Sequence, residues 1–163
     1  MSGAPVPPPN RVPWPPLIYL AAALAALALG AALPGTRWAV GAAGTGLGAI
    51  LIAGGLGLDA WAMLTMMRAR ANILPHRSAT ALVTHGPFAF SRNPIYLGNT
   101  VVMAGLGFAL GNPWFLPAAA VAAGAVTHLA IRREEAHLAA LFGERWDAYS
   151  RRTARWLGLP REP

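Results

Sequence analysis

The chain has 163 residues, of which 55% are hydrophobic and only 12% are charged. Typical soluble domains carry roughly 25% charged residues, so this composition excludes an ordinary water-facing surface and predicts an integral membrane protein. The net charge of +7 comes from thirteen arginines, and the sequence has neither lysine nor cysteine. Without cysteine, disulfides, thiolate nucleophiles and thiolate metal sites are excluded.

The N-terminal residues 1–16 are rich in proline and small residues and show no apolar periodicity, which predicts a disordered tail. The uncharged run 17–33 follows and is predicted to be the first transmembrane helix. A cleaved signal peptide is the alternative for this run. Its length and the prolines that precede it favour a retained span.

The second predicted span, residues 38–67, contains a single charged residue, Asp59. An acid inside an apolar span is by default a candidate functional residue, and the alternative is that water or Arg68 reaches it. Small residues four apart let helices approach closely, which favours packing over cofactor binding for the glycines of this span. These glycines are Gly44, Gly48, Gly54, Gly55 and Gly57.

The mostly non-apolar segment 68–93 comes next, and connections of this length are usually functional or disordered. The uncharged stretch that follows is broken by Gly111-Asn112-Pro113, so it is predicted to form two spans, 94–111 and 114–131, joined by a tight turn. From Leu138 to Tyr149, apolar residues recur at three- and four-residue steps. This spacing predicts an amphipathic helix or helix pair that either lies against the inner membrane surface or folds under the bundle.

The arginines predict the orientation in the membrane. Four lie within residues 68–92 and seven within 132–161, so the positive-inside rule puts these regions and both termini in the cytoplasm of a multi-pass inner-membrane protein. The basic excess follows topology, and no aromatic–basic platform for nucleic acid is present. The expected fold is an all-α integral membrane helical bundle of about four transmembrane helices with a C-terminal amphipathic cytoplasmic segment. Residues 17–163 form its single domain, and the oligomeric state stays open.

The turn into the third span reads Asn93-Pro94-Ile95-Tyr96-Leu97-Gly98. Pro94 suits a first helical turn, and Asn93 is predicted to cap the helix with its side chain. From spacing alone, a capped helix with an interfacial tyrosine is the simpler interpretation.

Two acids, Glu134 and Glu135, end the fourth span. They are either a solvated surface with local ion pairs or acceptors for a polar ligand. Because the third and fourth spans form a hairpin, we expect Tyr96 and Glu134 to face one pocket. Glu135 lies about 100° further around the helix and is expected to point elsewhere.

The histidines show no metal-ligand spacing, so no metal site is expected. His85 is a candidate base, with a surface loop histidine as the alternative.

Ordered motifs span residues 72–157: LVTHGPF at 82–88, SRNPIYLG at 91–98, EEAHLAALFG at 134–143, and RWL at 155–157 after Tyr149. With this spacing the sequence resembles the isoprenylcysteine carboxyl methyltransferase family and its relatives, the phospholipid methyltransferases. Those are integral membrane enzymes that use S-adenosylmethionine. The resemblance implies that a lipophilic substrate reaches the site sideways from the bilayer. It implies cofactor contacts from Thr80, Ala81, Leu82, Val83, Phe88, Asn93, Pro94, Ile95, Tyr96 and Glu134.

Two positions depart from the prenylcysteine enzymes. Asn93 stands where those enzymes carry histidine, and Ala130 stands where they place an arginine beside the substrate carboxylate. Arg132 and Arg133 are the substitutes that the sequence offers for substrate binding. The predicted activity is S-adenosylmethionine-dependent methyl transfer to a lipophilic or membrane-accessible carboxylate, thiol or amine, with no catalytic residue identified. A phospholipid or small-amine N-methyltransferase and a non-catalytic membrane scaffold are the alternatives.

Overall fold

A computed structural model describes residues 14–71 and 80–158, and every regular element in these ranges is helical. The elements are α1 (Trp14–Ala32), η1 (Pro34–Thr36), α2 (Gly41–Arg68), η2 (Gly86–Ala89), α3 (Pro94–Leu110), α4 (Phe115–Val126), η3 (Thr127–Ile131), α5 (Arg132–Phe142) and α6 (Glu144–Arg152). Helix α4, the π-helical turn η3 and α5 run on as one continuous helix. These elements confirm the predicted all-α bundle.

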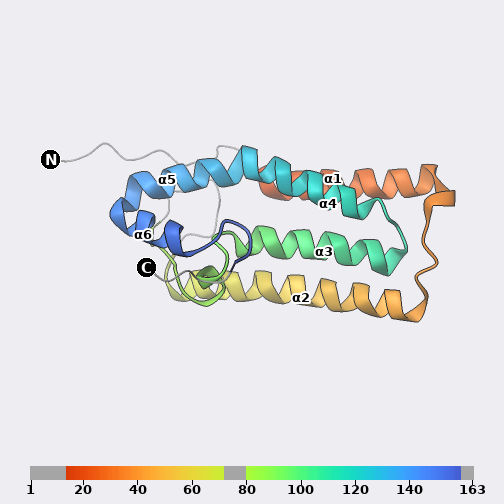
Figure 1. Cartoon of the computed structure of the whole chain (residues 1–163), viewed down its shortest axis with the longest axis horizontal. Helices are drawn as coiled ribbons and strands as arrows, with labels where there is room; N and C mark the ends of the chain where they lie inside the picture. Colours follow the sequence, from red (N-terminus) through yellow and green to blue (C-terminus); the bar gives the residue numbers. More distant parts are fainter. Residues whose placement is uncertain (1–13, 72–79, 159–163) are drawn as a thin grey trace.

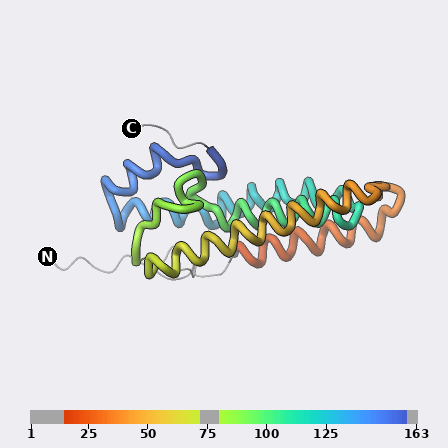
Figure 2. The backbone as a smooth tube through the Cα atoms, turned by 90° about the horizontal axis from the view of Figure 1, so that it is seen from below, coloured from red at the N-terminus to blue at the C-terminus, as the bar shows by residue number. Residues whose placement is uncertain are grey.

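Helix α3 occupies the centre of the bundle, with α2 on one side and the α1/α4 pair on the other (Figure 1). The turns that join α1 to α2 and α3 to α4 lie at one end. Residues 80–93, α5, α6 and residues 153–158 gather at the opposite end, which we call the head (Figures 1 and 2). Segments that are far apart in the sequence therefore meet in the head.

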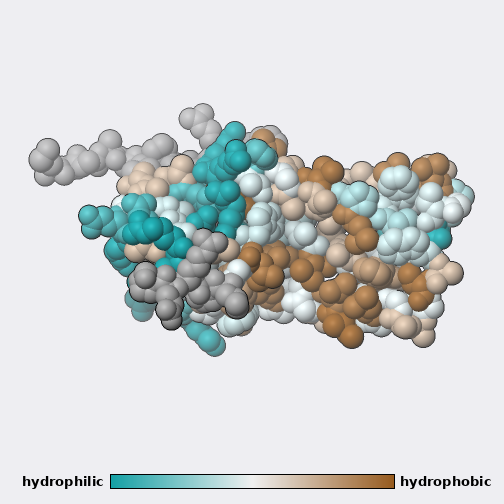
Figure 3. All heavy atoms as spheres, in the orientation of Figure 1, coloured by the Kyte–Doolittle hydropathy of each residue, from teal (hydrophilic) through white to brown (hydrophobic). Residues whose placement is uncertain are grey.

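Within residues 14–71 and 80–158, three helices are long and apolar enough to cross a membrane: α1, α2 and the continuous helix Phe115–Phe142. Helix α3, with 17 residues, lies at the short end of the range of about 17–25 residues that spans a bilayer. Large apolar side chains point outward, and Ile50 and Val121 are 70% and 69% exposed. Hydrophilic residues gather on the head and apolar residues on the remainder (Figure 3). This pattern is that of a membrane protein.

The helix boundaries differ from the sequence prediction by more than one residue at two places. Helix α1 begins at Trp14, so residues 14–16 are helical and are not part of a tail. Proline is tolerated in a first turn because its missing N–H has no partner there in any case. Helix α2 begins at Gly41, three residues later than expected. The rest of the predicted tail lies outside the described residues.

Helices α2 and α3 approach closely because glycines face each other. A Cβ atom on Gly55 would lie 2.7 Å from the carbonyl oxygen of Gly98, and one on Gly48 would collide with the backbone of Ala109. The packing prediction is therefore right for Gly48 and Gly55. It is wrong for Gly54 and Gly57, because a Cβ atom at either would meet nothing within 4 Å, and for Gly44, where it would meet only the side chain of Val40 just before the same helix.

We predict that Gly55→Ala destabilises the protein and that Gly54→Ala does not. The new methyl at position 55 pushes α3 away, and overpacking of this kind costs about 1–3 kcal/mol. Position 54 has open space, so helix propensity makes Gly54→Ala neutral or stabilising by up to about 1 kcal/mol. Thermal unfolding in one detergent compares the two. Equal melting temperatures would contradict the observed packing.

Candidate functional site

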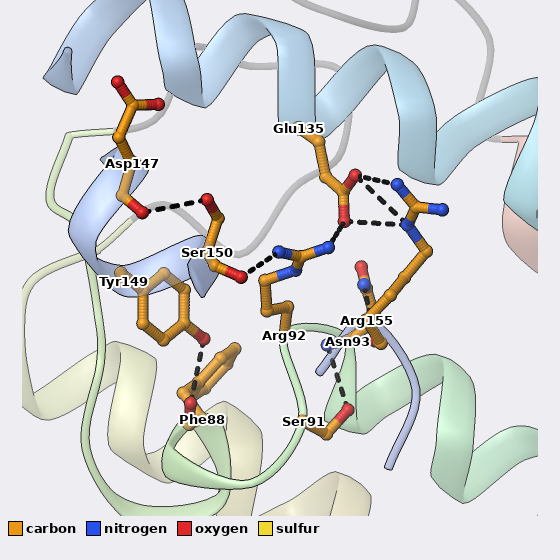
Figure 4. Close-up of polar contacts among 9 residues, drawn as sticks. All are labelled: Phe88, Ser91, Arg92, Asn93, Glu135, Asp147, Tyr149, Ser150 and Arg155. Atoms are coloured by element: carbon orange, nitrogen blue, oxygen red, sulfur yellow. Dashed lines mark hydrogen bonds and ion pairs between the residues drawn. The ribbon is translucent and has the colours of Figure 1, made fainter. Parts of the chain in front are cut away.

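The head is held together by a cluster of three charged side chains, Arg92, Glu135 and Arg155, which we call the Glu135 cluster (Figure 4). The Glu135 carboxylate accepts a hydrogen bond of 2.6 Å from Nη2 of Arg155 and further bonds from its Nε. It also pairs with Nη2 of Arg92 at 3.0 Å. The side chains of Arg92 and Glu135 are only 13% and 14% exposed, so water screens this pair weakly.

The C-terminal segment, residues 153–158, is bonded along its length to the loop before α3. The N–H of Arg92 donates to the carbonyl of Ala154 at 2.9 Å, and the N–H of Gly158 donates to that of Phe90 at 3.0 Å. The side chain of Asn93 donates to the carbonyl of Arg155 at 3.0 Å. Asn93 makes no side-chain cap for α3, so the capping prediction is wrong. Its side-chain amide donates to the carbonyl of Arg155, a residue far along the chain, instead.

Helix α6 is fixed against the same loop by two side chains. The Tyr149 hydroxyl donates to the carbonyl of Phe88 at 2.8 Å, and Nη1 of Arg92 donates to the carbonyl of Ser150 at 2.8 Å (Figure 4). Burial raises the pKa of the Tyr149 phenol above its ordinary value; Arg92 opposes this rise and Glu135 adds to it. Tyr149 therefore stays protonated at neutral pH and remains a hydrogen-bond donor.

Tyr96 and Glu134 meet directly, as the hairpin argument predicted. The Tyr96 hydroxyl donates to Oε1 of Glu134 at 2.8 Å. The main chain of Tyr96 is bonded as well, because its carbonyl accepts a hydrogen bond of 2.9 Å from the Tyr19 hydroxyl on α1. Three helices are thus joined at one position, beside the turn η3. A π-helical turn adds one residue to a helix, and such turns are frequent at functional sites.

These contacts surround a cavity of about 410 Å³ between the head and the ends of α1, α2 and α3. Its volume falls in the range of roughly 300–1,000 Å³ that is typical of small-molecule sites. The described lining residues are Pro15, Pro16, Tyr19, Asp59, Met63, Met66, Ala81, Leu82, Val83, Phe88, Arg92, Asn93, Pro94, Ile95, Tyr96, Asn99, Glu134, Glu135, His137, Leu138, Trp146 and Tyr149.

The cavity gathers every residue for which the resemblance implies a cofactor contact, apart from Thr80. Thr80 is exposed, and its hydroxyl donates to the carbonyl of Arg70. The expected substrate residues Arg132 and Arg133 are both exposed and do not line the cavity. His85 is also exposed and outside the lining, as its surface-loop alternative requires.

Sequence reasoning missed the role of Arg92 and misplaced Glu135. Glu135 lines the cavity together with Glu134 instead of pointing elsewhere, because its carboxylate turns toward Arg92 and Arg155. The signal available in the sequence was the SRNP motif itself, in which Arg92 directly precedes Asn93. The two partners of Glu135 lie far from it along the chain, so helical periodicity does not predict the cluster.

A model of the phospholipid methyltransferase family matches residues 43–145, which is more than half of the sequence. The chain belongs to this family. Family membership indicates a methyltransferase, and it agrees with the membrane bundle described above. The match runs from α2 to the start of α6 and thus includes most of the cavity wall.

Part of the chain is also similar to the nickel-cobalt-cadmium resistance protein NccN of Alcaligenes xylosoxydans xylosoxydans, with 39% identity over 77 residues. The match covers 47% of this chain and 36% of that protein, so the chain corresponds to only part of its relative. Within residues 14–71 and 80–158, no group of three or more His, Cys, Asp or Glu side chains is arranged to hold a metal ion.

We predict that Glu135→Gln loosens the head. Removing one partner of a buried ion pair leaves an uncompensated charge, which costs about 3–5 kcal/mol in fully buried cases. Because Arg92 is slightly exposed, we expect the free-energy cost of Glu135→Gln to lie near the lower value. Hydrogen exchange of the amides in residues 88–93 and 153–158 should accelerate. The exposed acid Glu144 provides the control, Glu144→Gln. Unchanged protection in Glu135→Gln would show that the cluster does not hold these segments.

Proposed function

We propose that this protein transfers a methyl group from S-adenosylmethionine to a lipophilic acceptor at the cytoplasmic face of the membrane. The observation that carries the proposal is the hydrogen bond between Tyr96 and Glu134 in the cavity wall. It brings together the two sequence regions to which the family resemblance assigns the cofactor. The family match supports methyl transfer, while the donor and the acceptor are our inference.

The described lining fits a cationic methyl donor. Acidic side chains, Asp59 and Glu134, lie on the wall together with apolar ones such as Phe88 and Ile95. Oδ1 of Asp59 is buried and has no hydrogen-bond partner among the described residues. Negative charge in an apolar cavity favours a sulfonium or ammonium group, and carboxylates accept hydrogen bonds from ribose hydroxyls.

When bound, S-adenosylmethionine supplies an activated methyl group. The protein therefore has to bind the two reactants, orient them and exclude water. Glu134 would hold the polar part of the donor, and Tyr96 fixes the direction of that carboxylate through its hydroxyl. Phe88 would pack against the adenosyl group. Alignment of two bound reactants can contribute about 7–11 kcal/mol in favourable cases. The Glu135 cluster serves this alignment by keeping the head rigid.

The acceptor is proposed to reach the cavity from the bilayer. Pro16 on α1 and Met63 and Met66 on α2 form an apolar part of the lining, and methionine adapts to irregular apolar ligands. A prenylcysteine carboxylate is a poor fit, because Ala130 is fully buried and Arg132 and Arg133 point to solvent. The family match favours the phospholipid or small-amine alternative.

Donor binding is predicted to depend on Glu134 more than on Tyr96. In calorimetry with S-adenosylhomocysteine, Glu134→Gln should weaken binding by about 1.5–3 kcal/mol, because a charged acceptor of hydrogen bonds is lost. Tyr96→Phe should cost less, about 0.5–1.5 kcal/mol, because Tyr96 acts on the donor only by fixing the direction of the Glu134 carboxylate. No added metal should be required.

Glu144→Gln is the matched control, since Glu144 is exposed and outside the cavity. If Glu134→Gln and Tyr96→Phe both bind as the parent does, the pocket for the donor lies elsewhere. If the folded parent protein binds neither S-adenosylmethionine nor S-adenosylhomocysteine, the scaffold alternative is favoured.

The proposed orientation has the head in the cytoplasm, as the arginine distribution predicts. In this cysteine-free chain, Thr36→Cys in η1 and Arg151→Cys in α6 introduce single exposed thiols at opposite ends. An impermeant maleimide should label Thr36→Cys in intact cells and Arg151→Cys only after permeabilisation. The reverse pattern would put the cavity on the outer face.

A further inference from the structure

Asp59 is an acid that the bundle brings to the cavity from inside an apolar helix. It lies in α2, in the part of that helix nearer the head, and its carboxylate borders the cavity. The neighbouring position on α3 is Gly98, where any Cβ atom would collide with Oδ1 of Asp59. Glycine at this position therefore makes the space in which the carboxylate lies against the start of α3.

No side chain in the described parts of the protein neutralises Asp59. Its Oδ1 is buried without a hydrogen-bond partner, and Arg68 on the same helix makes no ion pair with it. An acid without a partner in a membrane helix is costly. Such a group persists in a native protein when function requires it.

The other acids of the described lining are already engaged. Glu135 is paired with Arg92 and Arg155, and Glu134 accepts the hydroxyl of Tyr96. Asp59 therefore differs from both, because its carboxylate faces the cavity without a protein donor. What it can bind there is a proton or a group that carries one.

We propose that Asp59 accepts the proton released by the methyl acceptor, and that the acceptor is therefore a protic nucleophile, an amine or a thiol, and not a carboxylate. This inference rests on the proposed methyl transfer. General bases of this kind contribute about 10²–10⁴-fold to the rate. It also assigns a task to the one acid that sequence analysis found inside a span.

The proposed step conserves atoms and charge. The proton of an ammonium N–H or of a thiol S–H passes to the Asp59 carboxylate, and the lone pair freed on nitrogen or sulfur forms the bond to the methyl carbon. The carbon–sulfur bond of the sulfonium donor breaks, and its electron pair leaves on sulfur as a neutral thioether. Asp59 then returns the proton to water after the product has left.

Charge also argues against a carboxylate acceptor. It would enter a cavity that Asp59 and Glu134 line, while the charge of the third acid of the lining, Glu135, is balanced by Arg92 and Arg155. Arg92 is the arginine among the described lining residues, and its guanidinium is bonded to Glu135 and to the carbonyl of Ser150. An anionic acceptor would thus meet like charge, whereas an ammonium or a neutral thiol would not.

The test uses three acceptors with one alkyl chain: dodecylamine, dodecanethiol and dodecanoate. Labelled-methyl transfer is measured in detergent for the parent, Asp59→Asn, Asp59→Glu and Asp147→Asn, the last being an exposed acid outside the cavity. We expect the parent and Asp147→Asn to methylate the amine or the thiol but not dodecanoate. Asp59→Asn should lose roughly 10²–10⁴-fold in rate, and Asp59→Glu should regain part of it.

Two further measurements keep the test independent of activity. Asp59→Asn should bind S-adenosylhomocysteine as tightly as the parent, because this ligand lacks the sulfonium charge that Asp59 would attract. Its melting temperature should equal or exceed that of the parent, because an unpartnered acid has been removed. Methylation of dodecanoate, transfer to none of the three acceptors, full activity of Asp59→Asn, or its loss of S-adenosylhomocysteine binding would each overturn the proposal. Failure of the parent to bind the donor would instead overturn the proposed function.

Discussion

Glu135 connects three parts of the chain that lie far apart in the sequence. Its carboxylate is held by Arg92, which lies just before α3, and by Arg155, which follows α6. Because Arg92 and Glu135 are nearly buried, these two charges require each other, and the more exposed Arg155 adds a second partner for Glu135. The loop before α3, the start of α5 and the C-terminal segment are thereby fixed relative to one another. The loop before α3 and the start of α5 both line the cavity, so the cluster fixes two of its walls.

The membrane helices supply the rest of that enclosure by a different kind of force. Glycines let α2 pack closely against α3. In lipid there is little hydrophobic driving force between helices, so this close van der Waals packing holds them together. This close packing carries Asp59 and the methionines of α2 to the cavity, while α1 contributes Tyr19. The head is thus polar and stabilised by hydrogen bonds and ion pairs, whereas the bundle is apolar and stabilised by van der Waals packing. The cavity lies where the two meet.

Much of the fold can be predicted from the sequence, because long uncharged runs indicate transmembrane helices and arginine-rich segments indicate their cytoplasmic ends. The meeting of Tyr96 with Glu134 was also predictable, since a hairpin returns its ends to one face. Three features were not. Asn93 turns to a distant carbonyl and does not cap its helix, Glu135 turns to arginines far along the chain, and Thr80 bonds to Arg70. Such choices depend on tertiary partners that local patterns do not contain.

Hydrogen exchange with and without S-adenosylhomocysteine tests the central claim most directly, namely that one cavity joins the loop before α3 to α5 and α6. The account predicts that the ligand protects amides within residues 81–96 and within residues 134–149 together. Protection confined to the opposite end of the bundle, near η1, or no protection at saturating ligand, would contradict it.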